Sequence, residues 1–141
     1  SHESGTLNLP GIVGLKAGIE FINNLGVENI KLYKNMLLTR LYEGIKDING
    51  VKIYSTSNVN KNSGILAINI LDCDSTEITE ILSNKYDIAV RGGYHCAPLA
   101  HKTLGTEKQG LVRISLGCFN TIEDIDYTIK AIQEISLSFS K

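Results

Sequence analysis

Residues 65–71, Ile-Leu-Ala-Ile-Asn-Ile-Leu, form a nearly continuous apolar run that decides the fold class of the chain. A short apolar run of this kind predicts a β-strand. The segment 51–56 is short and rich in β-forming residues, and the polar stretch 57–63 is typical of a connecting loop. Two further segments, 88–91 and 111–116, have the same strand character. The sequence therefore predicts four strands.

Helices precede, separate and follow these strands. After Pro10, the residues Ile12, Leu15, Ile19 and Ile22 recur at helical spacing. A second helix is predicted over about 27–48, and a third from a cap at Asp74 to about Tyr86. A short helical turn is predicted near Pro98, and a last helix after a cap at Asn120 or Thr121. The order α-α-β-β-α-β-β-α predicts an α+β fold in which helices cover one face of a small, mainly antiparallel sheet.

The composition is ordinary for one globular domain, with 141 residues, 43% hydrophobic residues and a formal net charge of −1. This charge favours neither nucleic acid nor a membrane as a partner, and no apolar run is long enough to span a bilayer. Cys73, Cys96 and Cys118 form no C-x-x-C pair, so we expect no disulfide framework, no metal site and a reducing, cytoplasmic compartment. Cys73 and Cys118 fit a structural role. Because the chain begins at Ser1 without Met, we expect a fragment of a longer protein.

The segment 91–98, Arg-Gly-Gly-Tyr-His-Cys-Ala-Pro, carries the strongest chemical signal. Its two glycines permit a tight excursion of the backbone, and Pro98 is typical of a helix start. Cys96 is thus expected just before a helix N-terminus, next to His95 and close to Arg91. Each of these neighbours favours a reactive thiolate. A small buried cysteine without chemistry fits the local pattern equally well.

Arg113 is the second candidate. Strand alternation puts Val112 and Ile114 on one face and Arg113 on the other, and Arg91 opposes its apolar neighbours in the same way. A guanidinium suits bidentate binding of an amino-acid carboxylate. For a lone strand arginine, a solvated or ion-paired surface role is the simpler interpretation. His101 could bind a phosphate or transfer a proton, although a position in a solvated loop is the simpler interpretation there too.

Three blocks of sequence together resemble a known family. The blocks are Glu3–Asn8 with Pro10–Ile12, then Ile88–Pro98, and then Val112–Ser115 followed by Phe119–Thr121. They are similar to the C-terminal part of class V aminotransferase-fold enzymes, specifically cysteine desulfurases and selenocysteine lyases. The pattern R-x-G-x-H-C-A resembles the branch with a short, ordered cysteine loop. The resemblance covers essentially the whole chain.

The resemblance implies a role for each matching residue. Cys96 matches the catalytic cysteine that accepts sulfur as a persulfide, and Arg113 matches the arginine that binds the substrate carboxylate. Arg91 and His95 match positions of the active-site loop on the substrate side. Thr6, with Gly5, matches a site for the phosphate of pyridoxal 5'-phosphate in the neighbouring subunit of a homodimer. A hydroxyl and backbone N–H groups on a glycine loop suit that contact.

The resemblance also implies what this chain lacks. Residues 1–141 match the C-terminal small domain, with 1–9 as a loop from the domain junction, whereas the lysine that holds the cofactor covalently lies in a large domain outside this chain. We expect the full protein to convert L-cysteine to L-alanine and to pass the sulfur on Cys96 to an acceptor protein, as in iron–sulfur cluster assembly. The fragment alone should be inactive. Two alternatives stay open: a selenocysteine lyase or other β-lyase of this fold, and a cofactor-free α+β binding or dimerisation module.

Overall fold

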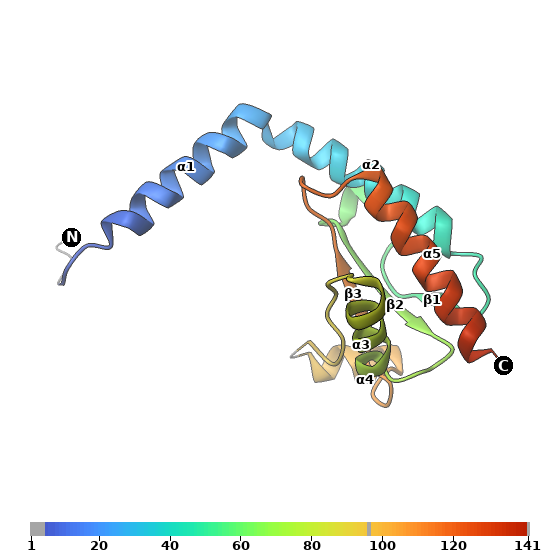
Figure 1. Ribbon diagram of the computed structural model, residues 1–141. Coiled ribbons are helices and arrows are strands. Elements are labelled where there is room, and N and C mark those ends of the chain that lie inside the picture. The colour runs from blue at the N-terminus through green and yellow to red at the C-terminus, as the bar shows by residue number, and fades with distance from the viewer. Residues whose placement is uncertain (1–4, 96, 141) are drawn as a thin grey trace. The chain divides into compact units, whose positions relative to one another are not determined.

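The computed structural model of the chain describes residues 5–95 and 97–140. These residues fall into two compact units, which divide between Tyr33 and Lys34. The elements, labelled in Figure 1, are α1 (Leu9–Leu25), α2 (Val27–Ile45), β1 (Val51–Ile53), the 3-10 helix η1 (Val59–Lys61), β2 (Ile65–Ile70), α3 (Ser75–Tyr86), α4 (Pro98–Leu104), β3 (Val112–Ser115) and α5 (Ile122–Phe139). The first unit holds α1 and the beginning of α2, and the second holds the rest.

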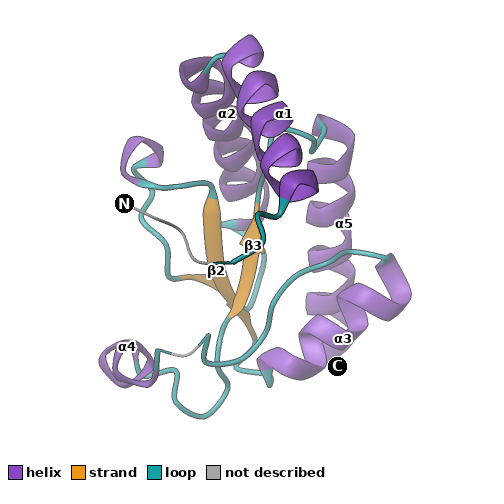
Figure 2. Cartoon of the chain, turned by 90° about the vertical axis from the view of Figure 1, so that its left-hand side faces the viewer, coloured by secondary structure: helices purple, strands orange, loops and turns teal. Residues whose placement is uncertain are grey.

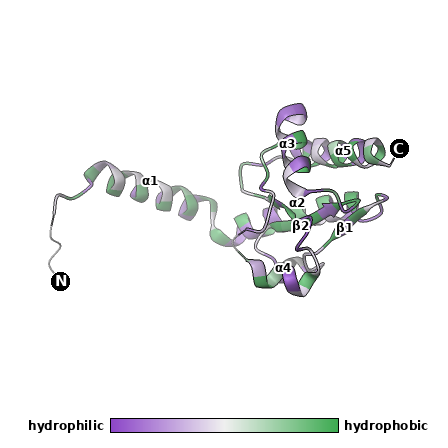
Figure 3. Ribbon diagram, turned by 90° about the horizontal axis from the view of Figure 1, so that it is seen from below, coloured by the Kyte–Doolittle hydropathy of each residue, from purple (hydrophilic) through white to green (hydrophobic). Residues whose placement is uncertain are grey.

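Helix α1 begins where the sequence predicts a helix. The side chain of Asn8 accepts a hydrogen bond from the Gly11 N–H at 3.1 Å, which satisfies one of the free donors of the first turn. The helix ends at Gly26, whose φ of +81° is a left-handed conformation that suits glycine. No residue of α1 is buried, and its large apolar side chains, among them Ile12 and Leu15, are between 42% and 66% exposed. Figure 3 shows hydrophobic residues along this helix.

The second unit is built on a three-stranded antiparallel sheet in the order β1-β2-β3. The central strand β2 pairs with β1 through Val51 opposite Ile70, and with β3 through Ile68 opposite Val112. The residue on β2 that faces Arg113 is Ala67. The apolar run that opened the sequence analysis therefore forms the middle of the sheet.

The core lies on one face of this sheet. Figures 2 and 3 show α3 and α5 on one side of the strands and α4 on the other side. The large apolar side chains that are fully buried come from the strands and from α2, α3 and α5: Leu37, Leu38, Leu41, Ile45, Leu66, Ile68, Ile70, Ile78, Leu82, Val112 and Ile132. This arrangement confirms the predicted α+β fold with helices packed on an antiparallel sheet.

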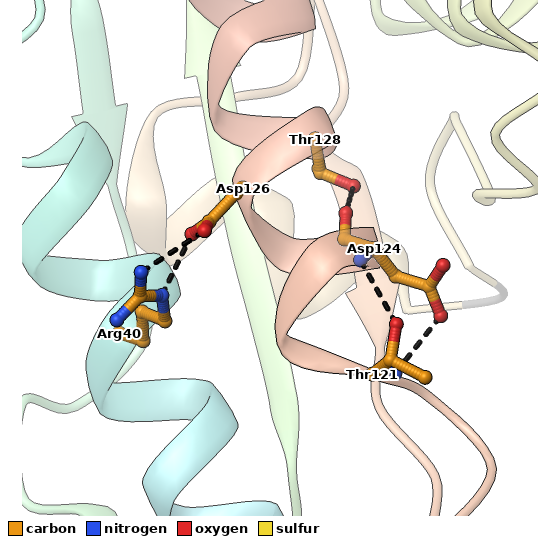
Figure 4. Close-up of polar contacts among 5 residues, drawn as sticks. All are labelled: Arg40, Thr121, Asp124, Asp126 and Thr128. Carbon is orange, nitrogen blue, oxygen red and sulfur yellow. Dashed lines mark hydrogen bonds and ion pairs between the residues drawn. The ribbon is translucent and has the colours of Figure 1, made fainter.

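Polar contacts join α2 to α5 and fix the start of α5 (Figure 4). Arg40 donates two hydrogen bonds to the carboxylate of Asp126, at 2.6 and 2.9 Å. This bidentate pair lowers the pKa of Asp126 below its usual range. Thr121 and Asp124 form a capping box, since each accepts a hydrogen bond from the backbone N–H of the other. Thr128 donates to the Asp124 carbonyl one turn later, at 2.8 Å. The predicted cap at Thr121 is confirmed.

The predicted strand at 88–91 is wrong. Asp87 ends α3 in a left-handed conformation, with φ of +55°, and the Ile88 N–H bonds back to the Leu82 carbonyl at 2.9 Å. The chain reaches the sheet only at Arg91, which forms an isolated bridge with Arg113. Residues 88–90 have strand propensity, but the end of α3 leaves them without a partner strand.

Candidate functional site

The site begins where residues 91–93 meet β3. Arg113 donates its backbone N–H to the Arg91 carbonyl at 2.8 Å, and Arg91 donates back to the Arg113 carbonyl at 3.1 Å. The Leu111 N–H then bonds the Gly93 carbonyl at 3.2 Å. In an antiparallel pair, residues that exchange both hydrogen bonds lie directly opposite each other, with their side chains on the same face. The register therefore places Arg91 and Arg113 side by side.

This face is the one away from the core. Val112 and Ile114 are buried, whereas Arg113 between them is half-buried and Arg91 is exposed. The prediction that Arg113 points away from the core is confirmed by the burial pattern of β3. Arg91 points the same way because it forms a bridge with Arg113, although residues 88–91 do not form a strand. Helix α4 lies on this side of the sheet (Figures 2 and 3).

The two guanidinium groups lack a counter-charge within residues 5–95 and 97–140. No described carboxylate forms an ion pair with Arg91 or Arg113, and the Nε of Arg113 is buried without a hydrogen-bond partner. Like charges directly opposite each other in a sheet are unfavourable, and an unsatisfied buried donor adds to the cost. The arrangement can bind an anion such as a carboxylate, which would supply both missing interactions.

Gly92 and Gly93 bring this segment against the N-terminus of α3. A Cβ atom at Gly92 would lie 2.5 Å from both the Ser75 carbonyl oxygen and the Thr79 Oγ1, so only glycine fits. Gly93 donates its N–H to the Ser75 hydroxyl at 2.9 Å and has a φ of +102°. The two glycines thus do more than permit a turn, because they fix the loop to α3.

His95 lies within reach of the charges of both arginines. Its Nε2 is 2.9 Å from the Leu111 carbonyl, so Nε2 carries the proton, and its Nδ1 is buried without a partner among the described residues. Burial lowers the pKa of His95, and the charges of Arg113 and Arg91 lower it further, against the opposing effect of the Leu111 hydrogen bond. His95 is therefore a neutral proton acceptor at Nδ1. Its φ of +51° is uncommon for a residue other than glycine and is typical of functional loops.

His101 does not lie in a solvated loop, and that prediction is wrong. It sits in α4 with 3% of its surface exposed, and its Nδ1 lies 2.7 Å from the Thr106 hydroxyl. Its Nε2 lies 3.0 Å from the Tyr94 carbonyl. The sequence carried a signal for the helix, namely Pro98 at its start and Gly105 after its end. The sequence carried no signal for the burial of the His101 ring, which depends on its contacts with Tyr94 and Thr106.

The remaining predicted residues are placed as follows. Cys96 lies outside the described residues. Gly5 and Thr6 belong to the first unit and are exposed, and Gly5 has a φ of +125°. Arg91, His95 and Arg113 belong to the second unit and come together there. None of the described helices is both long and apolar enough to cross a membrane. Among the described residues, no three His, Cys, Asp or Glu side chains are grouped to hold a metal ion.

Comparison with known proteins places this geometry in a family. A model of aminotransferase class-V proteins matches residues 1–128. The chain belongs to the aminotransferase class-V family. The match contains all three blocks on which the sequence resemblance rests, and it confirms that resemblance.

Relatives of the chain are described as cysteine desulfurases. A probable cysteine desulfurase of Methanothermobacter thermautotrophicus is 35% identical over 136 residues, which cover 95% of this chain and 33% of that protein. The apo structure of cysteine desulfurase from Thermococcus onnurineus has a TM-score of 0.88 at 31% identity, covering 96% of this chain and 33% of that one. The Escherichia coli cysteine desulfurase CsdA, in an S-sulfonic acid form, has a TM-score of 0.82 at 25% identity, covering 97% and 32%. The chain thus spans about a third of the length of these relatives.

Proposed function

We propose that this chain is the C-terminal part of a pyridoxal-phosphate-dependent cysteine desulfurase, in which Cys96 accepts the sulfur of L-cysteine. The observation that carries the proposal is that Arg91 and Arg113 lie directly opposite each other without a counter-ion among the described residues. Arg91 precedes Cys96 by five positions in the sequence. A fold does not retain two uncompensated opposed cations for stability. The names of the relatives support the same activity.

Arg113 binds the carboxylate of the substrate in this proposal. Its half-buried position holds the guanidinium in a fixed direction, and its free Nε supplies one of the two donors that a bidentate carboxylate contact needs. Arg91 adds a second positive charge on the same face. His95, with a pKa lowered by burial, offers a neutral acceptor to the substrate or to a thiol that gives up its proton.

The residues at hand fit one end of the cofactor. Thr6 is exposed, and Gly5 has open space around its Cα and a positive φ, so the backbone N–H groups and the hydroxyl are free to approach a phosphate. We propose that they contact the phosphate of pyridoxal 5'-phosphate in the neighbouring subunit of a homodimer, while a lysine outside this chain holds the cofactor covalently. When bound, the cofactor withdraws electrons from the substrate.

Cys96 performs the sulfur transfer in this proposal. Its thiolate attacks the sulfur of L-cysteine, so that an S–S bond forms while the Cβ–S bond of the substrate breaks. The electron pair of the broken bond stays with the substrate carbon, which takes up a proton and leaves as L-alanine. The persulfide on Cys96 then passes its outer sulfur to an acceptor protein, as in iron–sulfur cluster assembly. A free thiol of this kind suits a reducing compartment such as the cytoplasm.

Helix α1 supports the view that the chain acts within a longer protein. Its side chains Ile12, Leu15 and Ile19 recur at helical spacing and are each at least half exposed. An exposed apolar face of this kind is typical of a surface that another part of a protein covers.

The replacement Cys96→Ser in the full-length protein tests the central assignment. We expect loss of persulfide and of cysteine-dependent alanine formation, with the visible absorbance of the bound cofactor unchanged. Cys118→Ser is the matched control, because Cys118 is half-buried and stands outside the loop. Desulfurase activity that persists in the Cys96→Ser protein contradicts the proposal.

The replacement Arg113→Lys tests carboxylate binding. Lysine keeps the charge but not the planar pair of donors, so we expect kcat/KM for L-cysteine to fall by roughly 10-fold or more, with the larger part in KM. Cysteamine, which is L-cysteine without its carboxylate, should bind the wild type and the variant equally weakly. A variant that loses binding of both compounds in equal measure contradicts the role of Arg113.

A further inference from the structure

The segment 94–106 is held together by side chains that the proposed reaction does not use. His101 is the centre of this network, and it contacts the backbone of the cysteine loop rather than solvent. Its partner Thr106 has no exposed surface. A buried pair of polar groups such as this one is retained only when its hydrogen bonds are made.

The hydrogen bonds fix the orientation of the His101 ring. The partner of Nε2 is the Tyr94 carbonyl, which can only accept, so Nε2 carries the proton. In the neutral ring, Nδ1 then accepts from the Thr106 hydroxyl. The Thr106 N–H bonds the His101 carbonyl at 2.9 Å, so the two residues are joined twice. The ring therefore has one tautomer and one direction.

His101 binds the backbone carbonyl of Tyr94, which stands two residues before Cys96 in the sequence. The Tyr94 carbonyl also accepts the Ala97 N–H at 2.9 Å, so the residues on both sides of Cys96 in the sequence meet at this oxygen. The Tyr94 ring packs edge-on against His101 with centroids 5.1 Å apart, and its hydroxyl donates to the Glu107 carbonyl. Tyr94 is thereby attached to α4 through its carbonyl and to the segment that follows α4 through its hydroxyl.

We propose that His101 is a positioning residue whose imidazole, oriented by Thr106, holds the Tyr94 carbonyl and so fixes the backbone of Tyr94, which precedes Cys96 by two positions in the sequence. The proposal rests on the proposed function only for the importance of Cys96. The bracing of the loop stands on the contacts alone. His101 acts through Tyr94 and touches no reacting group.

Hydrogen exchange in the full-length protein tests the bracing directly. The variant His101→Leu removes both hydrogen bonds and keeps an apolar side chain in the space. We expect amide exchange in peptides from 94–106 to become about 10-fold faster or more, because the variant loses two buried hydrogen bonds of average strength. Exchange in peptides of α5 should stay unchanged.

The variant His101→Gln separates hydrogen bonding from shape. Its amide nitrogen can donate to the Tyr94 carbonyl, and its amide oxygen can accept from Thr106. We expect this variant to restore slow exchange in 94–106. Exchange that stays slow in His101→Leu, or that is as fast in His101→Gln as in His101→Leu, overturns the proposal.

A second pair of variants decides the case if His101→Leu also accelerates exchange in α5. Thr106→Val keeps the shape of the side chain and removes only the hydroxyl, whereas Thr106→Ser keeps the hydroxyl. We expect faster exchange in 94–106 for Thr106→Val and wild-type exchange for Thr106→Ser. Equal exchange in the two variants overturns the proposal.

Steady-state kinetics adds a readout that loss of stability alone does not move. In His101→Leu we expect kcat for L-cysteine to fall about 10-fold with KM unchanged, since Arg113 is untouched, and His101→Gln should restore kcat. A rise in KM with unchanged kcat overturns the positioning role. If the wild type has no desulfurase activity, the proposed function fails, while the exchange experiments still decide the bracing.

Discussion

Arg113 should reduce the stability of this chain, and its removal should raise it. The buried Nε of Arg113 has no partner among the described residues, and an unsatisfied buried donor costs about 1–3 kcal/mol. Arg91 lies directly opposite, and relief of a like-charge cross-strand pair adds about 0.2–1 kcal/mol. Methionine keeps most of the apolar stem of arginine. We therefore expect Arg113→Met to raise the free energy of unfolding by about 1–4 kcal/mol, the sum of the two contributions.

Urea unfolding of the 141-residue chain, followed by circular dichroism, measures this change. Arg40→Met is the matched control, because Arg40 makes a bidentate pair with Asp126, and its loss should lower stability or leave it unchanged. The gain in Arg113→Met should shrink in high salt, which screens the repulsion between Arg91 and Arg113. A loss of stability in Arg113→Met would show that the two arginines are compensated in the fold, and it would refute the reasoning.

Three further predictions follow from the loop and its surroundings. Gly92→Ala should destabilise the chain by about 1–3 kcal/mol through contact with α3, as measured by urea unfolding, whereas Gly14→Ala, with open space around it, should stabilise α1 by about 0.5–1 kcal/mol. Because the pKa of His95 lies below its ordinary value of 6.5, the unfolded chain binds a proton that the folded chain does not, so stability should fall as the pH drops below about 6.5. His95→Asn, which tolerates the left-handed backbone and does not titrate, should lose this part of the pH dependence in unfolding curves. Burial raises the pKa of Cys73, so iodoacetamide should alkylate Cys73 more slowly at pH 8 than it alkylates free cysteine, as peptide mass spectrometry would show; equal rates would contradict this assignment.

Local patterns in the sequence were sufficient for most elements. The apolar run 65–71 is β2, the alternation at 111–116 is β3, and the caps at Asp74 and Thr121 begin α3 and α5. These signals are local because side-chain period and capping depend on residues a few positions apart. The face taken by Arg113 was predictable for the same reason.

The site depended on partners that are distant in the sequence. Residues 88–90 have strand propensity yet belong to no strand of the described sheet, because a strand exists only where a neighbouring strand supplies its hydrogen bonds. Position 92 requires glycine because the Ser75 carbonyl lies close to it, and no local sequence pattern predicts that contact. His101 has nearer partners, Thr106 and Tyr94, but both lie outside α4, so helical periodicity does not indicate that they bury its ring.

The sequence by itself therefore determined the α+β class, the order of the helices and three of the predicted strands, and the candidates Arg91, His95 and Arg113. Only the tertiary structure decided that Arg91 and Arg113 stand opposite each other, that the buried Nδ1 of His95 has no partner among the described residues, and that His101 contacts the Tyr94 carbonyl. The physical reason is that periodicity and capping act within a few residues of the chain. Strand register, burial and the pairing of charges are properties of segments that only the folded chain brings together.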